Sequence, residues 1–307
     1  MQAPVRINDI LLVLVVISSM AAAIIFPDFG SQFKVFPFYC LMINFLLSYL
    51  SIDLGSIWKA LKDNGIQILA LTVMKLVILP VVIYFVFYLF APAYALSALL
   101  LSGVSTGVVA PMISNMVEGN SALVLVAVVV TSMLAPFTLP ALIDIVVAKE
   151  VAISLVSMIR MLATVIFVPI IVVEMIRYLL PRLVRPILKV QFPVALLMFA
   201  LMNLGVFYRY AAFFKKEPSV IISATVVALI LAAICCVVGI FFFRKGPLEN
   251  QLAAAVVLCN INNVLVIVFA SEFFGPIEPL VAAMYVVPFF AIVIPLRYYH
   301  HRRTRTA

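Results

Sequence analysis

The sequence predicts an all-α membrane protein, and three observations lead to that fold class. Hydrophobic residues account for 67% of the 307 residues, whereas charged residues account for only 10%. The mean hydropathy is +1.30, and a soluble core of this size does not need so apolar a chain. Apolar runs of about 20 residues recur along the chain, the length at which an α-helix crosses a hydrocarbon layer of ~30 Å. The chain is therefore predicted to cross a membrane several times.

Ten transmembrane helices are predicted from the segments that interrupt the apolar runs. Polar residues, prolines and glycines cluster in these interruptions and mark helix ends. In chain order they read PDFGSQFK, DLGSIWKALKDNG, APAYA, VEGNS, AKEVA, RYLLPRLVRPILK, YRYAAFFKKEPS, FRKGPLEN and EFFGPIEP. The helices between them are predicted over residues 9–27, 35–52, 65–90, 93–117, 121–147, 152–178, 190–208, 219–243, 249–272 and 277–299. The first run is long enough to span and follows a single basic residue, Arg6, so it is predicted as a helix and not as a signal peptide.

Lys and Arg are distributed unevenly between the two sets of loops. If both termini are cytoplasmic, the inner side holds most of them, and the outer loops hold Lys34, Lys149, Arg209, Lys215 and Lys216. The positive-inside rule then predicts a multi-pass protein of a cell membrane, the bacterial inner membrane, with cytoplasmic N- and C-termini. The net charge of +8 follows from this topology and requires no nucleic-acid partner. The basic tail RYYHHRRTRTA is expected to contact anionic lipids of the bilayer.

The chain reads as two related halves. Each half carries a span with a polar patch at mid-length, a short apolar stretch, an acidic-Gly turn and a further span with prolines. Because each half has five predicted helices, an odd number, the halves must face opposite ways across the membrane. We therefore predict a first inverted repeat at residues 1–150 (helices 1–5) and a second at residues 151–307 (helices 6–10), which ends in the basic cytoplasmic tail.

Two predicted helices, the fourth and the ninth, contain polar residues at mid-membrane. The fourth has Ser105, Thr106 and Pro111 inside an apolar run, which predicts a break near residues 106–111. The ninth is predicted to break near residues 260–263. Asparagine side chains can replace the hydrogen bonds that an unwound backbone loses, and non-helical backbone at this depth must be buried in protein or line a cavity. The candidate binding residues from these helices are Ser105, Thr106, Ser114, Asn115, Asn260, Asn262 and Asn263.

A structural role remains open for these polar residues. Asn260, Asn262 and Asn263 could hold helices together without binding a ligand. Three asparagines within four positions point around much of a helix, however, so helix contact alone would leave one facing lipid. The hydroxyls of Ser105 and Thr106 could bond to their own helix.

The sequence resembles the bile acid:sodium symporter family. The resemblance is carried by GVVAPMISNMVEGNSALVLVAVVVTSMLAPFTLPAL and LENQLAAAVVLCNINNVLVIVFASEFFG, including the Gly119-Asn120 turn and Pro136. It implies a panel domain packed on a core domain, with helices four and nine crossing at their broken middles. It also implies that a small organic anion binds beside the crossing.

The sequence departs from the family at the positions that ligate sodium. Where sodium-coupled members carry oxygen ligands, this chain has Ala110-Pro111, Val124, Val128, Val257 and Ile261-Asn262. Sodium is a hard cation that prefers several oxygen ligands, and valine offers none. The resemblance also implies that a lysine replaces a sodium-ligating Gln of the third helix.

That lysine is Lys75, which lies about ten residues, or roughly 15 Å, from either end of its predicted helix. Three roles are open for its amine. It could stay protonated and replace a bound cation, it could carry a proton and couple transport to the proton gradient, or it could bind a substrate carboxylate. Pairing with Glu174 is less favoured, because Glu174 lies near the cytoplasmic end of its helix.

An enzymatic function is not supported by the sequence. His300 and His301 are the only histidines and lie in the tail, so no catalytic triad or histidine metal site is expected inside the bundle. The four cysteines have no zinc or redox spacing, and no cofactor is predicted. The sequence predicts a sodium-independent secondary transporter of a small organic anion, proton-coupled or facilitative. The alternatives are a non-transporting membrane sensor or scaffold on the same fold, and a conventional sodium symporter with altered sites.

Overall fold

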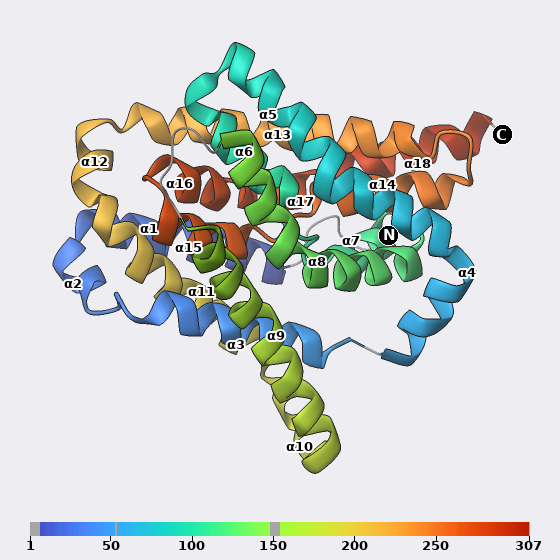
Figure 1. Ribbon diagram of the computed structural model, residues 1–307, viewed down its shortest axis with the longest axis horizontal. Coiled ribbons are helices and arrows are strands. Elements are labelled where there is room, and N and C mark those ends of the chain that lie inside the picture. The colour runs from blue at the N-terminus through green and yellow to red at the C-terminus, as the bar shows by residue number, and fades with distance from the viewer. Residues whose placement is uncertain (1–6, 53, 148–153, 307) are drawn as a thin grey trace.

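The computed structural model describes residues 7–52, 54–147 and 154–306. Within these ranges the chain forms helices, turns and one isolated β-bridge (Figure 1). The predicted all-α class is confirmed for this part of the chain. The predicted start of the sixth helix, at residue 152, lies outside the described residues, as do Arg6 and Lys149.

The helices match the predicted spans to within a few residues, apart from an earlier start of the third helix, at Leu54, and a later end of the tenth, at Thr306. In the first half they are α1 (Ile7–Ile25), α2 (Pro27–Ser31), α3 (Phe36–Leu50), α4 (Leu54–Val73), the π-helical turn η1 (Met74–Ile78), α5 (Leu79–Phe90), η2 (Pro92–Tyr94), α6 (Ala95–Gly103), α7 (Ala110–Met116) and α8 (Ser121–Val147). The helix that contains the third span begins at Leu54, whereas the apolar stretch long enough to cross a membrane covers residues 65–90, as predicted. Both predicted breaks are present, the first between α6 and α7.

The described residues from 154 onward form a further series of helices. It contains α9 (Leu155–Leu179), α10 (Pro181–Lys189), α11 (Gln191–Phe207), η3 (Tyr208–Tyr210), α12 (Ala211–Lys216), α13 (Ser219–Phe242), α14 (Leu248–Cys259), α15 (Asn263–Phe273), α16 (Ile277–Met284), α17 (Val286–Ala291) and α18 (Val293–Thr306). The second break lies between α14 and α15. The short helix α10, with cations and apolar residues on different sides, was not predicted.

Six helical stretches of the described chain are long and apolar enough to cross a membrane. They cover residues 65–90, 121–147, 155–179, 191–216, 219–242 and 277–304. Shorter apolar helices accompany them, and these include α1, α3 and both parts of the broken ninth span. The molecule is therefore a multi-pass helical membrane protein.

The helices pack in two groups. One contains α1, α3, α9 and α11, in which α11 packs on both α1 and α3, and α3 packs on α9. The other contains α4–α8 and α13–α16, with both broken spans inside it. The groups meet where α8 packs on α9 and where α15 packs on α3 and α11.

Small residues allow α13 and α14 to approach closely in the second group. A Cβ atom at Gly239 would lie 2.3 Å from the Cα of Ala255, so only glycine fits at this position. This contact holds α14 firmly against its neighbour. The break at the end of α14 is positioned by that packing.

Candidate functional site

The two unwound segments cross and bond to each other through their backbones. Thr106 and Ile261 form an isolated antiparallel β-bridge. The amide of Gly107 donates to the carbonyl of Asn260 at 2.6 Å, and the amide of Asn262 donates to the carbonyl of Ser105 at 2.9 Å. Backbone groups at this depth have no water to bond to, so each segment supplies partners that the other needs.

The crossing requires a glycine on the α6–α7 side. A Cβ atom at Gly107 would lie 2.9 Å from the carbonyl oxygen of Ile261 and 3.3 Å from its carbonyl carbon. These are backbone atoms within the β-bridge, so they cannot move aside without breaking it. Gly107 thus sets how closely the two segments approach.

The last carbonyls of α14 are bonded by donors from several elements. A helix end leaves its last four carbonyls without partners inside the helix, and it carries a partial negative charge. Here each has a donor: Val256 accepts from the amide of Asn260 (2.8 Å), Val257 from the Thr106 hydroxyl (3.1 Å), Leu258 from the Lys75 amine (3.3 Å) and Cys259 from the Tyr285 hydroxyl (2.8 Å).

Lys75 reaches this helix end from a π-helical turn. The amide of Leu79 donates to the carbonyl of Met74, five residues earlier, which is the π-helical pattern. Pro80 follows directly and has no amide to donate, which favours this local departure from the α-helix. Turns of this type are frequent at functional sites.

The Lys75 amine is enclosed by protein. The residue is 0% exposed, and its Nζ donates to the carbonyl of Leu258. The thiols of Cys235 and Cys259 lie within electrostatic range of it. No carboxylate of the described residues lies within ion-pair distance of this amine. A buried ammonium without a counter-ion depends on oppositely polarised groups, and the C-terminal end of α14 provides them.

A cavity of about 420 Å³ lies beside the crossing, between the two helix groups. Its wall includes Asn44 of α3, Gln191 of α11 and Asn262 and Asn263 of the ninth span. Most of the other lining is apolar and comes from Leu12, Leu41, Phe45, Val109, Met112, Phe192, Phe199, Phe289 and Phe290. The exposed Lys189 also lines it. The cavity has the size and the mixed lining of a small-molecule site.

The polar part of this cavity is suited to an anionic group. Asn263 and Val264, the first two residues of α15, line the cavity, and amides at these positions have no acceptor within their helix. The Asn262 side chain caps the helix by accepting from the amide of Leu265 at 3.2 Å. Across the cavity, Asn44 is buried, and its Nδ2 has no hydrogen-bond partner among the described residues. A carboxylate close to these donors would be stabilised.

The predicted site residues fall into three groups. Lys75, Ser105, Thr106 and Asn260 are buried at the crossing and do not line the cavity, whereas Asn262 and Asn263 do. Within the described chain, the Ser105 hydroxyl and the Asn260 Oδ1 have no hydrogen-bond partner.

Ser114 and Asn115 form the third group, and they do not line the cavity. Ser114 is buried where its carbonyl accepts from the amide of Gly119 at 2.8 Å, and Asn115 is exposed at the end of α7. Their assignment as binding residues remains a prediction.

Two residues of the site were not predicted. Asn44 is the single amide side chain within the apolar run of α3, and that isolation was a signal that could have identified it. Tyr285, which is fully buried and bonds to Cys259, gives no such signal, because aromatic residues are common in apolar spans. Its role depends on tertiary packing.

The comparisons with known proteins identify one family. The model for the Sodium Bile acid symporter family matches residues 38–217, which is more than half of the chain. No curated protein matches the chain.

Proposed function

The chain belongs to the sodium bile acid symporter family, and on that premise we propose that it is a secondary transporter of a small organic anion that does not co-transport sodium. The substrate binds in the cavity beside the crossing. The Lys75 amine replaces a mobile cation in holding the crossing together.

The lining of the crossing cavity favours a carboxylate attached to an apolar body. The N-terminal end of α15 carries partial positive charge, and Asn44 on the opposite helix group offers an unpartnered donor. Lys189 adds a full positive charge at the wall. Aromatic and aliphatic side chains of both groups would cover the rest of the substrate.

The single observation that carries the sodium-independent mechanism is the bond from Lys75 Nζ to the Leu258 carbonyl. A cation at this position bridges the C-terminal end of α14 to the third span. The Lys75 ammonium has three donors and is covalently attached to the chain. It can therefore bridge the two elements without an ion from solution.

Among the three roles open for Lys75, the geometry favours the structural one. The residue does not line the crossing cavity, which argues against direct contact with the substrate. Its 0% exposure gives a proton no direct path from water in this conformation. The proton-carrier role therefore requires a rearrangement that the structural role does not.

The finer topology is part of the same proposal. The ten helices form two inverted repeats, residues 1–150 and 151–307. The group of α1, α3, α9 and α11 is the panel domain, and the other group is the core domain. With both termini in the bacterial cytoplasm, the crossing cavity lies on the cytoplasmic side.

Transport and coupling are tested on the full chain in proteoliposomes. A radiolabelled monocarboxylate is selected by thermal-shift screening, and its exchange against unlabelled substrate is measured in sodium and in choline buffers. We expect equal exchange in the two buffers. A strict sodium requirement would overturn the coupling proposal, and no exchange with any ligand that binds would overturn the transport proposal and favour a sensor or scaffold.

A second candidate function is a sodium symporter with altered ion sites. Two buried oxygen atoms at the crossing, Ser105 Oγ and Asn260 Oδ1, have no partner among the described residues and are of the type that sodium prefers. The choline experiment separates this candidate from the first, because only this candidate requires sodium for uptake.

A further inference from the structure

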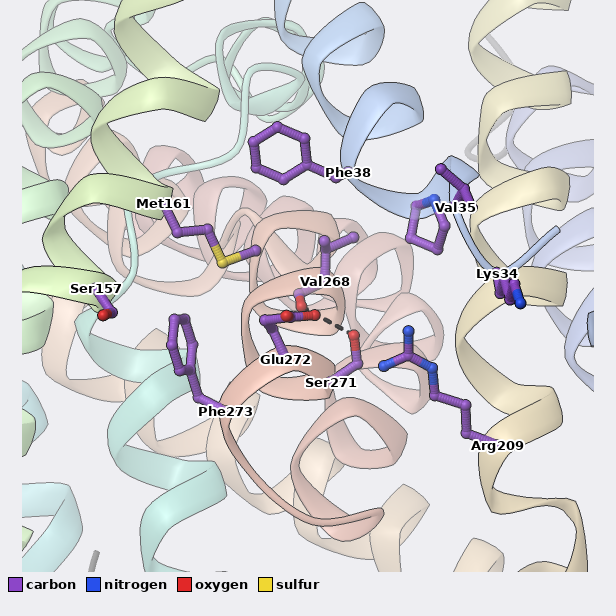
Figure 2. Close-up of a pocket in the computed structure, with 12 residues that line it drawn as sticks. Lys34, Val35, Phe38, Ser157, Met161, Arg209, Val268, Ser271, Glu272 and Phe273 are labelled. Atoms are coloured by element: carbon purple, nitrogen blue, oxygen red, sulfur yellow. Dashed lines mark hydrogen bonds between the residues drawn. The ribbon is translucent and has the colours of Figure 1, made fainter. Parts of the chain in front are cut away.

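A second cavity, of about 430 Å³, lies at the other end of α15 and shares no lining residue with the crossing cavity (Figure 2). Its walls come from the segment between α2 and α3, from the first turn of α3, from α9, from α11 and η3, and from the last turns of α15. Asn263 at the crossing cavity and Glu272 here are separated by nine residues of one helix, or about 13 Å. The two cavities are therefore separate places on the same interface between the helix groups. We call the second one the Arg209 cavity.

The Arg209 cavity is lined by charges of both signs. Lys34 and Arg209 belong to the group that contains α3 and α11, whereas Glu272 belongs to α15 of the other group. The Arg209 guanidinium points toward Ser271 and Glu272 in Figure 2. Within the described ranges, none of the three charged side chains forms a hydrogen bond or an ion pair within 4.0 Å. Opposite charges thus face one cavity without neutralising each other.

Most of the remaining lining is apolar, and the cavity is larger than a single water molecule requires. Phe38, Met161 and Phe273 form part of its wall. A water molecule occupies about 30 Å³ of liquid volume, so a cavity of this size exceeds what one bridging water would fill. It falls instead in the range of small-molecule pockets, roughly 300–1,000 Å³.

We infer that the Arg209 cavity binds a zwitterion with an apolar body, of the size of an amino acid with a large apolar side chain. The carboxylate of the ligand binds to Arg209, whose planar guanidinium matches it with two parallel donors, and Lys34 adds charge on the same side. The ammonium group binds to Glu272. The apolar body lies against Phe38, Met161 and Phe273.

A simple anion fits this cavity less well than a zwitterion. It would engage Arg209 and Lys34 but would leave the Glu272 carboxylate facing a charge of the same sign, which is unfavourable. A simple cation would have the reverse mismatch with Arg209. A ligand with both charges pairs with the charged residues of both helix groups at once. This inference does not depend on which substrate occupies the crossing cavity.

The test uses three probes that share one apolar body. L-Phenylalanine has both charges, 3-phenylpropionate lacks the ammonium, and 2-phenylethylamine lacks the carboxylate. Binding of each to the full chain in nanodiscs is measured by calorimetry. We expect phenylalanine to bind at least about tenfold more tightly than either of the other two. Binding of 3-phenylpropionate that is as tight or tighter and that Arg209→Gln removes, or no binding of any probe, would overturn the inference. Binding of 3-phenylpropionate that Asn44→Leu removes belongs to the crossing cavity and is not counted in this comparison.

Variants locate the binding site. In Glu272→Gln we expect the preference for phenylalanine over 3-phenylpropionate to disappear, and in Arg209→Gln we expect phenylalanine binding to fall by about tenfold or more. Lys216→Gln is the matched control, because Lys216 is an exposed cation of α12 that does not line the cavity. Unchanged binding in both cavity variants, with unfolding temperatures like that of the wild type, would place the ligand elsewhere.

One further variant separates this inference from the transport proposal. Asn44→Leu alters the crossing cavity only. We expect it to leave phenylalanine affinity unchanged, whereas loss of phenylalanine binding in Asn44→Leu would assign the zwitterion to the crossing cavity and contradict the inference.

Discussion

The amide of Gly107 donates a 2.6 Å hydrogen bond to the carbonyl of Asn260, more than 150 positions further along the chain. This bond and the neighbouring β-bridge join the two broken helices directly, backbone to backbone. The unwound segments are therefore held by each other as well as by side chains. The crossing can persist in a membrane for that reason.

Replacing Gly107 tests whether the two unwound segments must approach as closely as they do. In Gly107→Ala we expect the free energy of unfolding to fall by about 1–3 kcal/mol, because the new Cβ would overlap the Ile261 carbonyl. Thermal unfolding in detergent measures the effect. The control is Gly65→Ala, where a Cβ meets no atom within 4 Å and where alanine favours the helix. Equal stability of the two variants would contradict the required close approach.

Two substitutions at Asn262 distinguish its role as a helix cap from a role in ligand binding. In Asn262→Ala, loss of the cap on Leu265 is expected to lower the free energy of unfolding by about 1 kcal/mol. In Asn262→Asp the cap is preserved, so stability is expected to stay near that of the wild type, but the added negative charge beside the cavity is expected to weaken anion binding. Thermal unfolding and calorimetry with the screened monocarboxylate measure the two effects. An aspartate variant that binds the anion as tightly as wild type would show that the α15 N-terminal end does not hold it.

Asn44→Leu tests the opposite wall of the crossing cavity. The leucine removes an unpartnered donor, so we expect substrate affinity to fall by about tenfold while the fold is retained. Ser18→Leu is a matched polar-to-apolar control, because Ser18 is exposed on α1 and does not line the cavity. If both variants bind the substrate equally well, Asn44 has no part in recognition.

Lys75 variants distinguish the remaining roles of the amine. In Lys75→Met, counterflow is expected to be lost, because the methionine cannot donate to Leu258. In Lys75→Arg, which keeps a permanent charge, partial exchange is expected if the role is structural. A proton carrier would instead give pH-gradient-driven uptake in the wild type that disappears in Lys75→Arg while exchange continues. Wild-type activity in Lys75→Met would refute both roles.

The order of helices was predictable because apolar runs and their interruptions are properties of local sequence. The breaks at residues 104–109 and 260–262 were also predictable, since Pro111 and the asparagine cluster are incompatible with an ordinary lipid-facing helix. Counting residues predicted that Lys75 lies deep in its span, and its side chain is buried within the protein.

The partners of these residues were not predictable from local sequence. That Lys75 bonds to Leu258, and that Tyr285 bonds to Cys259, depends on how distant helices pack. The same is true of the division among the asparagines, in which Asn260 is buried away from the cavity while Asn263 lines it. The Arg209 cavity was also missed, because its three charges come from loops and helix ends that look like ordinary solvated positions in the sequence.

Helix α15 presents its first residues to one cavity and its last turns to the other. Because α15 lines both cavities, a shift of the helix at one cavity also moves its residues at the other. By thermodynamic linkage, a ligand in either place that prefers one position of α15 changes the affinity of the other place, and the factor is the same in both directions. A ligand at the N-terminal end of α15 would thereby change ligand binding at its C-terminal end, through eleven residues of a single helix.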